Sequence, residues 1–176
     1  MFKKLFIVIL GIMCVAMVKP VKKATASSSK FITIETSKGK VVIKTLPKIA
    51  PVHVKRIKEL VNQGFYDGII FHRVIKGFMA QTGDPDGNGT GGSGKNLKAE
   101  FSDYEYKYGT VGMARSMNPD SGDSQFFICF DGCSHLTGQY TVWGQVVSGM
   151  EAVENLAIGE PPSSPDKMIS VRLGKK

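Results

Sequence analysis

The chain has 176 residues, of which 42% are hydrophobic and 22% are charged, and its formal net charge is +8. Five lysines and no acidic residue lie in residues 1–26, so residues 27–176 carry a net charge of only +3. That excess is too small to indicate a nucleic-acid-binding protein. The remaining length, about 150 residues, is enough for one domain whose core needs no disulfide or metal to hold it together.

Residues 1–26 have the composition of an export signal. Two lysines precede the 14-residue apolar run LFIVILGIMCVAMV, and ATA stands directly before a run of serines. We predict a signal peptide cleaved after Ala26, with an uncleaved membrane anchor as the alternative. The apolar run is short for a bilayer span, which favours the signal peptide. The protein is therefore expected in the periplasm or another extracytoplasmic space, attached to a membrane only if the leader stays uncleaved.

The first segments after the leader predict a hairpin and a helix. FITIETSKGKVVIKTL alternates between apolar and polar residues, which predicts strands near 31–36 and 40–46 with a turn at SKG. In APVHVKRIKELVNQGF, apolar residues recur at helical spacing from Pro51 to the stop at Gly64, which predicts an amphipathic helix.

Short strands dominate the rest of the chain. IIFHRVI and FMAQ come before a glycine-rich loop, and TVGMAR, SQFFICF, YTVWGQVV and KMISVRL come after it, with one short helix predicted at GMEAVENLA. No βαβ repeat is visible. Many short strands with only two helices predict an antiparallel barrel or sandwich, in one domain over residues 27–176.

The glycine-rich loop, residues 83–96, matches parts of three ligand motifs. It contains the spacing of a dinucleotide-binding turn from Gly87, that of a phosphate-binding loop ending at Lys95, and the opening of a calcium loop from Asp84. The first two motifs require a helix directly after the loop, and none is predicted. The calcium loop requires a carboxylate where Lys95 stands. The histidines also lack metal-ligand spacing. We therefore predict no nucleotide, metal or other cofactor.

Two cysteines follow the leader, Cys129 and Cys133. A redox pair is usually spaced C-x-x-C at the start of a helix, whereas Cys129 ends an apolar, strand-like run. We predict that Cys129 is a free structural cysteine. A disulfide, which export would permit, and a redox pair are the alternatives.

Five blocks of sequence occur in the same order as in a known enzyme family. They are YDGIIFHRVIKGFMAQTGD, GNGTGG, GMAR, SQFFIC and HLTGQYTVWGQVVSGM. With these blocks, residues 31–173 resemble the cyclophilins, the peptidyl-prolyl cis–trans isomerases. The resemblance implies a mainly β fold, a closed eight-stranded antiparallel barrel capped by two α-helices. It implies cofactor-independent isomerisation of X-Pro bonds in extended or unfolded polypeptides, assisting protein folding. The alternative is a non-catalytic chaperone or scaffold module that binds proline peptides.

The resemblance also implies the residues of the site. Rotation about an X-Pro bond breaks no covalent bond, so the site needs a proline slot and a cationic donor to the twisted amide. Arg73 is implied as that donor, because its planar fork can reach carbonyl oxygen and nitrogen together. His72 faces the other side of the strand, and we interpret it as a packed structural histidine. The implied proline pocket comprises Phe78, Met79, Phe127 and Leu136, and the implied contacts to the flanking peptide are Gln81, Ala114, Arg115, Gln125, His135 and Tyr140.

Three of these positions depart from the usual family pattern. Arg115 stands where many members have Asn, and Tyr140 replaces a frequent His. His135 occupies the position of a Trp in the members best known for binding cyclosporin, so affinity for cyclosporin-type inhibitors is left open. The expected partners are proline-containing peptides and unfolded proteins, with no nucleic acid, and the expected state is a monomer.

Overall fold

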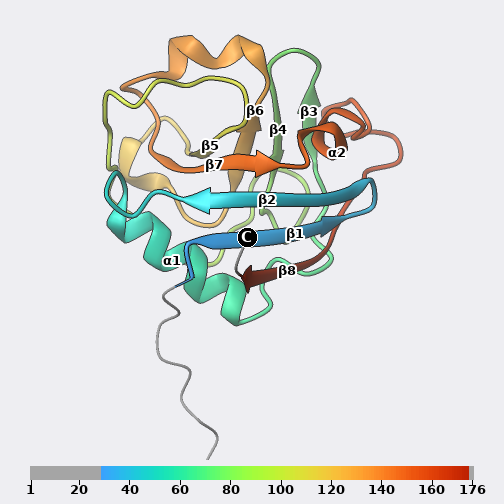
Figure 1. The fold of residues 1–176 in the computed structure, drawn as a ribbon, viewed down its shortest axis with the longest axis horizontal. Helices are drawn as coiled ribbons and strands as arrows, with labels where there is room; N and C mark the ends of the chain where they lie inside the picture. The colour runs from blue at the N-terminus through green and yellow to red at the C-terminus, as the bar shows by residue number, and fades with distance from the viewer. Residues whose placement is uncertain (1–28, 175–176) are drawn as a thin grey trace, which may run out of the picture.

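The computed structural model describes residues 29–174, which contain one curled sheet of eight antiparallel strands (Figure 1). The predicted leader lies outside the described residues. The strands are β1 Phe31–Thr36, β2 Gly39–Thr45, β3 Arg73–Ile75, β4 Met79–Thr82, β5 Thr110–Met113, β6 Phe126–Cys129, β7 Val142–Ser148 and β8 Met168–Gly174. The helices are α1 Pro51–Asn62 and α2 Met150–Glu154, and two 3₁₀ turns are η1 Pro119–Ser121 and η2 Asp131–Leu136. Among residues 29–174, no helix is long and apolar enough to cross a membrane.

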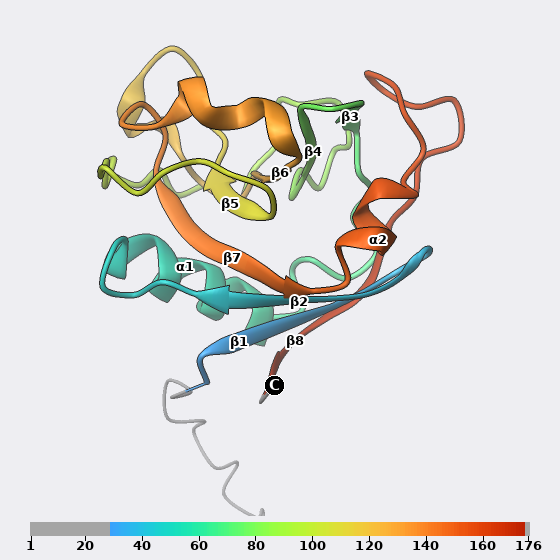
Figure 2. The ribbon, with the colours of Figure 1, turned by 45° about the horizontal axis from the view of Figure 1, so that its top comes forward.

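The sheet has the strand order β3-β4-β6-β5-β7-β2-β1-β8 and curves around an interior (Figure 2). The segment before β3 closes the sheet against the start of β8, because the N–H of Phe71 donates to the Asp166 carbonyl at 2.8 Å and that of Gly68 to the Met168 carbonyl at 2.7 Å. The predicted eight-stranded antiparallel fold is confirmed. Its closure consists of this short bridge, since β3 and β8 do not form a ladder with each other. The bridge also explains why β3 is shorter than the predicted strand IIFHRVI.

The predicted hairpin and first helix are confirmed and supply much of the main core. Ile32 and Ile34 of β1 are both buried, as alternation requires, and α1 turns its apolar residues inward and contacts β7 and β8. The N-cap residue Ala50 has no capping side chain. Glu100 takes over that function from a distant loop, because its carboxylate accepts the N–H groups of Val52 at 3.0 Å and His53 at 2.9 Å.

A second, smaller apolar cluster lies apart from the main core, and β6 separates the two. Phe126 and Ile128 belong to the main core, whereas Phe127 and Cys129 belong to the second cluster. Successive side chains of a strand point to opposite faces of the sheet, so β6 contributes to both clusters. Since the second cluster also contains Met79 and several loop residues, β4 and β6 present an apolar surface on the side away from the main core.

Candidate active site

A cavity of about 420 Å³ opens over the second apolar cluster. Its lining residues are Arg73, Phe78, Met79, Gln81, Ala114, Arg115, Phe127, His135, Leu136, Gln139 and Tyr140. The fold thus brings together ten of the eleven residues that the family resemblance implies. The remaining one, Gln125, lines a neighbouring cavity of about 440 Å³, which shares Gln81, Ala114 and Arg115 with the first.

Strand register places the polar and apolar parts of this cavity side by side. Arg73 of β3 pairs with Gln81 of β4, and Gln81 pairs with Phe127 of β6. Directly paired residues project from the same face of a sheet at about 4.5–5.5 Å between Cβ atoms. The cation, the amide and the aromatic ring therefore form one row across three strands.

The floor of the cavity is apolar and nearly closed to solvent. Met79, Phe127 and Leu136 are 2%, 4% and 8% exposed. Phe78 lies just before β4 and follows Gly77, whose φ of +74° bends the chain so that Phe78 and Met79 reach the same cavity. The exposed His135 stacks on Phe78, with ring centroids 5.5 Å apart, and so extends the aromatic wall.

Arg73 lies at the edge of this floor with a defined orientation. Its Nε donates to the Glu160 carboxylate at 2.8 Å, and one terminal nitrogen lies 3.9 Å from the sulfur of Met79. Its side chain is 37% exposed. The Nε edge of the guanidinium is therefore bonded to Glu160, and the rest of the group lies within reach of the cavity.

His72 is buried, as predicted for a packed histidine. It is 4% exposed, and within the described part of the chain neither ring nitrogen has a hydrogen-bond partner. Burial lowers the pKa of His72, which the nearby Asp84 carboxylate only partly offsets. The ring is therefore neutral at physiological pH.

Two glutamines connect the cavity to the glycine-rich loop. Gln81 donates through its side-chain amide to that of Gln125 at 2.9 Å, and Gln125 donates to the Gly91 carbonyl at 2.8 Å. The neighbouring cavity is lined by the loop residues Gly89, Thr90, Gly91, Gly92, Gly94 and Asn96. A Cβ on Gly92 would stand 2.5 Å from a carboxylate oxygen of Asp123, so a side chain there would displace that carboxylate, which accepts the N–H of Gly94 at 2.8 Å.

The carboxylate of Asp84 holds the glycine-rich loop together. It is 1% exposed and accepts N–H groups of the loop, from Asp86 at 2.8 Å and Asn88 at 3.0 Å. Burial alone would raise the pKa of Asp84, but these and two further loop N–H groups together lower it. The first residue of the apparent calcium motif is thus turned inward. Among residues 29–174, no group of three His, Cys, Asp or Glu side chains is placed to hold a metal ion.

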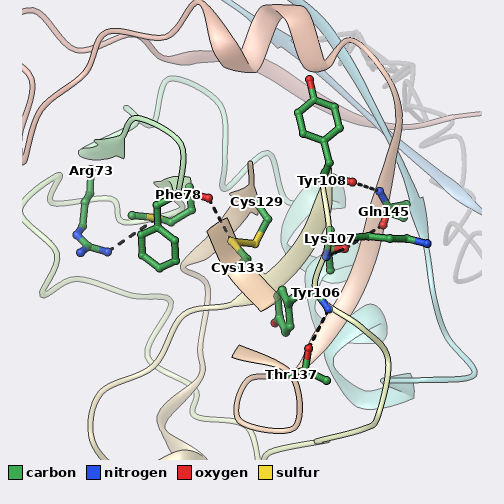
Figure 3. Close-up of a disulfide and its surroundings, with 11 residues drawn as sticks. Arg73, Phe78, Tyr106, Lys107, Tyr108, Cys129, Cys133, Thr137 and Gln145 are labelled. Atoms are coloured by element: carbon green, nitrogen blue, oxygen red, sulfur yellow. Dashed lines mark hydrogen bonds between the residues drawn. A yellow bond between two sulfur atoms is a disulfide. The ribbon is translucent and has the colours of Figure 1, made fainter. Parts of the chain in front are cut away.

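Cys129 and Cys133 form a disulfide, so the prediction of a free cysteine at position 129 is wrong. The prediction failed because η2 follows β6 directly and turns the chain back, which brings the two Cα atoms to 6.0 Å, a usual disulfide separation. Both residues are fully buried, and Cys133 Sγ lies 3.1 Å from the Phe78 carbonyl oxygen (Figure 3). The bond attaches the segment carrying His135 and Leu136 to the end of β6.

The side chain of Arg115 packs along the cavity rim. Its guanidinium lies 4.3 Å from the centroid of the Tyr140 ring and donates to the Gln139 carbonyl at 3.0 Å. The Tyr140 ring in turn packs edge-on against Phe127, at 5.8 Å between centroids. The charge that Arg115 adds beside the expected peptide path is thus held in place by an aromatic face.

Two residues of the site were missed at the level of sequence. Gln139 lines the cavity and donates to the His135 carbonyl at 2.8 Å. It stands inside the block HLTGQY, and that position could have indicated it. Glu160 lies in the loop GEPPSSP, whose composition carries no signal of contact with Arg73.

The arrangement suits a prolyl peptide. The apolar floor can receive a proline ring, the guanidinium can donate to the preceding amide, and the glutamines and rim backbone can contact the flanking chain. Burial of a ring on such a floor contributes roughly 25 cal/mol per Å² of apolar surface removed from water.

Comparison with known proteins agrees with this geometry. Residues 31–173 match the family model described as cyclophilin-type peptidyl-prolyl cis-trans isomerase/CLD. A probable peptidyl-prolyl cis-trans isomerase of Brucella abortus is 46% identical over 167 residues, and the alignment covers 85% of each chain. The peptidyl-prolyl cis-trans isomerase of Helicobacter pylori strain 26695 is 38% identical over 144 residues, and the alignment covers 80% of this chain and 88% of that protein.

Solved structures give the same result. A cyclophilin from Hirschia baltica superposes with a TM-score of 0.75 at 30% identity, covering 82% of this chain and 74% of its own. A cyclophilin-type isomerase of Cryptosporidium parvum, solved in the presence of the dipeptide Ala-Pro, has a TM-score of 0.78 at 28% identity, covering 83% of this chain and 99% of its own. The chain therefore belongs to the cyclophilin-type peptidyl-prolyl cis–trans isomerases, and is an isomerase.

Proposed function

We propose that this isomerase acts on X-Pro bonds of extended or unfolded polypeptides outside the cytoplasm, with Arg73 as the cationic donor. The observation that carries the proposal is the row formed by Arg73, Gln81 and Phe127, which sets a guanidinium beside a closed apolar floor. The Cryptosporidium parvum relative was solved in the presence of Ala-Pro, which supports a prolyl ligand for the matching cavity of this chain.

The catalytic step is rotation about a partial double bond. The barrier is about 18–20 kcal/mol, because twisting the amide removes its resonance and returns a lone pair to nitrogen. A donor that binds the twisted amide more strongly than the planar one lowers this barrier. With the proline ring over Phe127 and Met79, the guanidinium of Arg73 can donate to the twisted group. The peptide would use the carbonyl of Ala114, because the Ala114 N–H already donates to the Gln125 carbonyl at 2.9 Å.

The extracytoplasmic location rests on two features. The lysine-led apolar run in residues 1–26 has the form of a signal peptide, and the Cys129–Cys133 disulfide suits an oxidising compartment. We also propose a monomer as the acting unit, because the curled sheet leaves few strand edges open for association. N-terminal sequencing of the protein from an extracytoplasmic fraction should begin at Ser27, and a chain that still begins at Met1 would contradict cleavage.

Replacement of the guanidinium tests the mechanism. Arg73→Ala should lower kcat by roughly 10²–10³, or about 2.7–4 kcal/mol, as expected for loss of one preorganised donor. Binding of a proline peptide should persist, because the floor is apolar. Arg73→Lys should stay impaired, since an ammonium cannot present a planar fork. Arg172→Ala is a matched control, because Arg172 also forms an exposed ion pair, with Asp67, but lies on β8 outside the cavity.

Isomerisation of a proline-containing tetrapeptide and peptide binding by calorimetry give the two readouts. Arg73→Ala with activity within about threefold of the parent, at unchanged binding, would contradict a catalytic guanidinium. A parent protein that binds the peptide without isomerising it would instead favour a proline-peptide-binding chaperone or scaffold.

A further inference from the structure

We propose that Glu160 is a positioning residue that fixes the guanidinium of Arg73 for isomerisation. The inference rests on the role of Arg73 proposed above and adds a residue that lies 87 positions further along the chain. Glu160 sits in the loop between α2 and β8, outside the strands that build the cavity.

Backbone pairing brings this loop beside β3. Val74 and Gly159 form an isolated antiparallel bridge, in which the N–H of Val74 donates to the Gly159 carbonyl at 2.9 Å and the N–H of Gly159 to the Val74 carbonyl at 3.0 Å. In an antiparallel pair, the residue before one partner lies opposite the residue after the other. The bridge therefore sets Glu160 opposite Arg73, and it holds the loop there without any help from the Glu160 side chain.

The ion pair uses the Nε edge of the guanidinium. Arg73 Nε donates to Glu160 Oε2 at 2.8 Å, and one terminal nitrogen contacts the Met79 sulfur beside the proline pocket. Because the group is planar, fixing one edge and one end fixes the direction of the remaining N–H groups. Those groups are the ones left to donate to a bound amide.

Packing alone does not orient this side chain. Arg73 lines the cavity of about 420 Å³ on one side and a further cavity of about 350 Å³ on the other, the latter walled by Gly87, Glu160 and Pro161. Asp84, the acid buried next to His72, is already bonded to loop N–H groups. In residues 29–174, Glu160 is the acidic side chain in salt-bridge contact with Arg73.

The ion pair between Arg73 and Glu160 is exposed, so its loss should affect the chemical step more than the folding stability. The side chains of Arg73 and Glu160 are 37% and 52% exposed, and such pairs contribute little to folding stability. Holding a catalytic group in its productive geometry, by contrast, directly affects the chemical step. Loss of Glu160 should therefore lower kcat and leave KM and the melting temperature nearly unchanged.

The test compares Glu160→Ala and Glu160→Gln with Glu35→Gln, using an uncharged proline-containing tetrapeptide. Glu35 is a matched control, because it forms an exposed ion pair with Lys40 on the β1–β2 hairpin, outside the cavity. Glu160→Ala should lower kcat about three- to tenfold at constant KM. Glu160→Gln, which keeps an oxygen acceptor without the charge, should fall between Glu160→Ala and the parent.

Ionic strength supplies a readout that a merely structural role would not change. Between about 0.05 M and 1 M salt, screening should weaken the pair, so kcat of the parent and of Glu35→Gln should decline. The kcat of Glu160→Ala should not vary with salt. A parallel decline in all three proteins would overturn the proposal.

A double-mutant cycle then asks whether Glu160 acts through Arg73. In the Arg73→Ala background, Glu160→Ala should have no further effect on kcat, because the group that it positions is absent. Equal losses in both backgrounds would overturn the proposal. If Arg73→Ala is impaired while Glu160→Ala matches the parent, the positioning role fails and the catalytic role of Arg73 stands. If Arg73→Ala is fully active, both the catalytic role of Arg73 and the positioning role of Glu160 are wrong.

Discussion

At the scale of single residues, a glycine facing Phe127 makes room for the aromatic floor of the cavity. Gly112 of β5 pairs directly with Phe127 of β6, and a Cβ on Gly112 would stand 2.5 Å from the tip of the Phe127 ring. The Phe127 ring occupies that space and stacks on Tyr106, with centroids 5.8 Å apart. The absence of a side chain on Gly112 of β5 therefore determines the depth of the pocket over Phe127 of β6.

Phe127 and its neighbour Ile128 allow pocket and core to be tested separately. Phe127→Ala should raise KM and lower kcat/KM together, because it removes the surface that receives the proline ring in both ground and transition states. Ile128→Val, on the opposite face of β6, should cost about 0.5–1.5 kcal/mol of stability and leave the kinetics unchanged. Peptide kinetics and urea unfolding measure the two effects. A Phe127→Ala variant with the KM of the parent would show that the proline ring of the peptide binds elsewhere.

At the scale of elements, periodic segments were predictable and short turns were not. The hairpin of β1 and β2 and the helix α1 follow from period 2 and period 3.6 over six residues or more. The turn η2 spans six residues with a non-helical position at Gly132, so it has no period to detect. Missing η2 led directly to the wrong prediction for Cys129. Likewise, the resemblance of one continuous sequence block implied Phe127, whereas the contact of Glu160 with Arg73 depends on a bridge between distant segments that no local pattern encodes.

The disulfide should stabilise η2 and, through it, the pocket wall. A loop this short gives an expected stabilisation of about 2 kcal/mol from chain entropy. Cys129→Ala combined with Cys133→Ala should therefore lower the melting temperature. It should also raise KM, because the segment that carries Leu136 loses its disulfide bond to β6. The position of Arg73, and hence kcat, should be little affected. Thermal unfolding and peptide kinetics with and without dithiothreitol give the check. Reductant should shift the parent toward the double variant and leave the variant itself unchanged. No effect of reductant on the parent would show that the bond does not hold the wall.

At the scale of the whole molecule, carboxylates connect loops to the sheet and helices. Asp166 accepts the N–H of Ala157 and the hydroxyl of Ser37, and Asp67 accepts the N–H of Val171, so each joins segments far apart in sequence. Asp84 organises the glycine-rich loop and Glu100 caps α1. The order of the sequence blocks indicated the barrel, but these connections depend on side chains meeting after the sheet has closed, which sequence patterns do not report.

Glu100 makes the acid sensitivity of this arrangement testable. Burial alone would raise the pKa of Glu100, but the N–H groups of His53 and Val52 and the His53 ring lower it below its ordinary value of 4.5. A folded-state pKa below the unfolded one means that the stabilisation is complete at neutral pH and is lost as pH falls below about 4.5 through the folded value.

Glu100→Gln should therefore cost about 1–2 kcal/mol at pH 7, since it weakens the cap of α1. Its stability should also depend less on pH below 4.5 than that of the parent. Urea unfolding from pH 7 to pH 3 measures both effects, with the exposed Glu105→Gln as control. If the parent and Glu100→Gln lose stability in parallel over that range, the charge of Glu100 contributes nothing to the cap, and the acid sensitivity belongs to the other carboxylates.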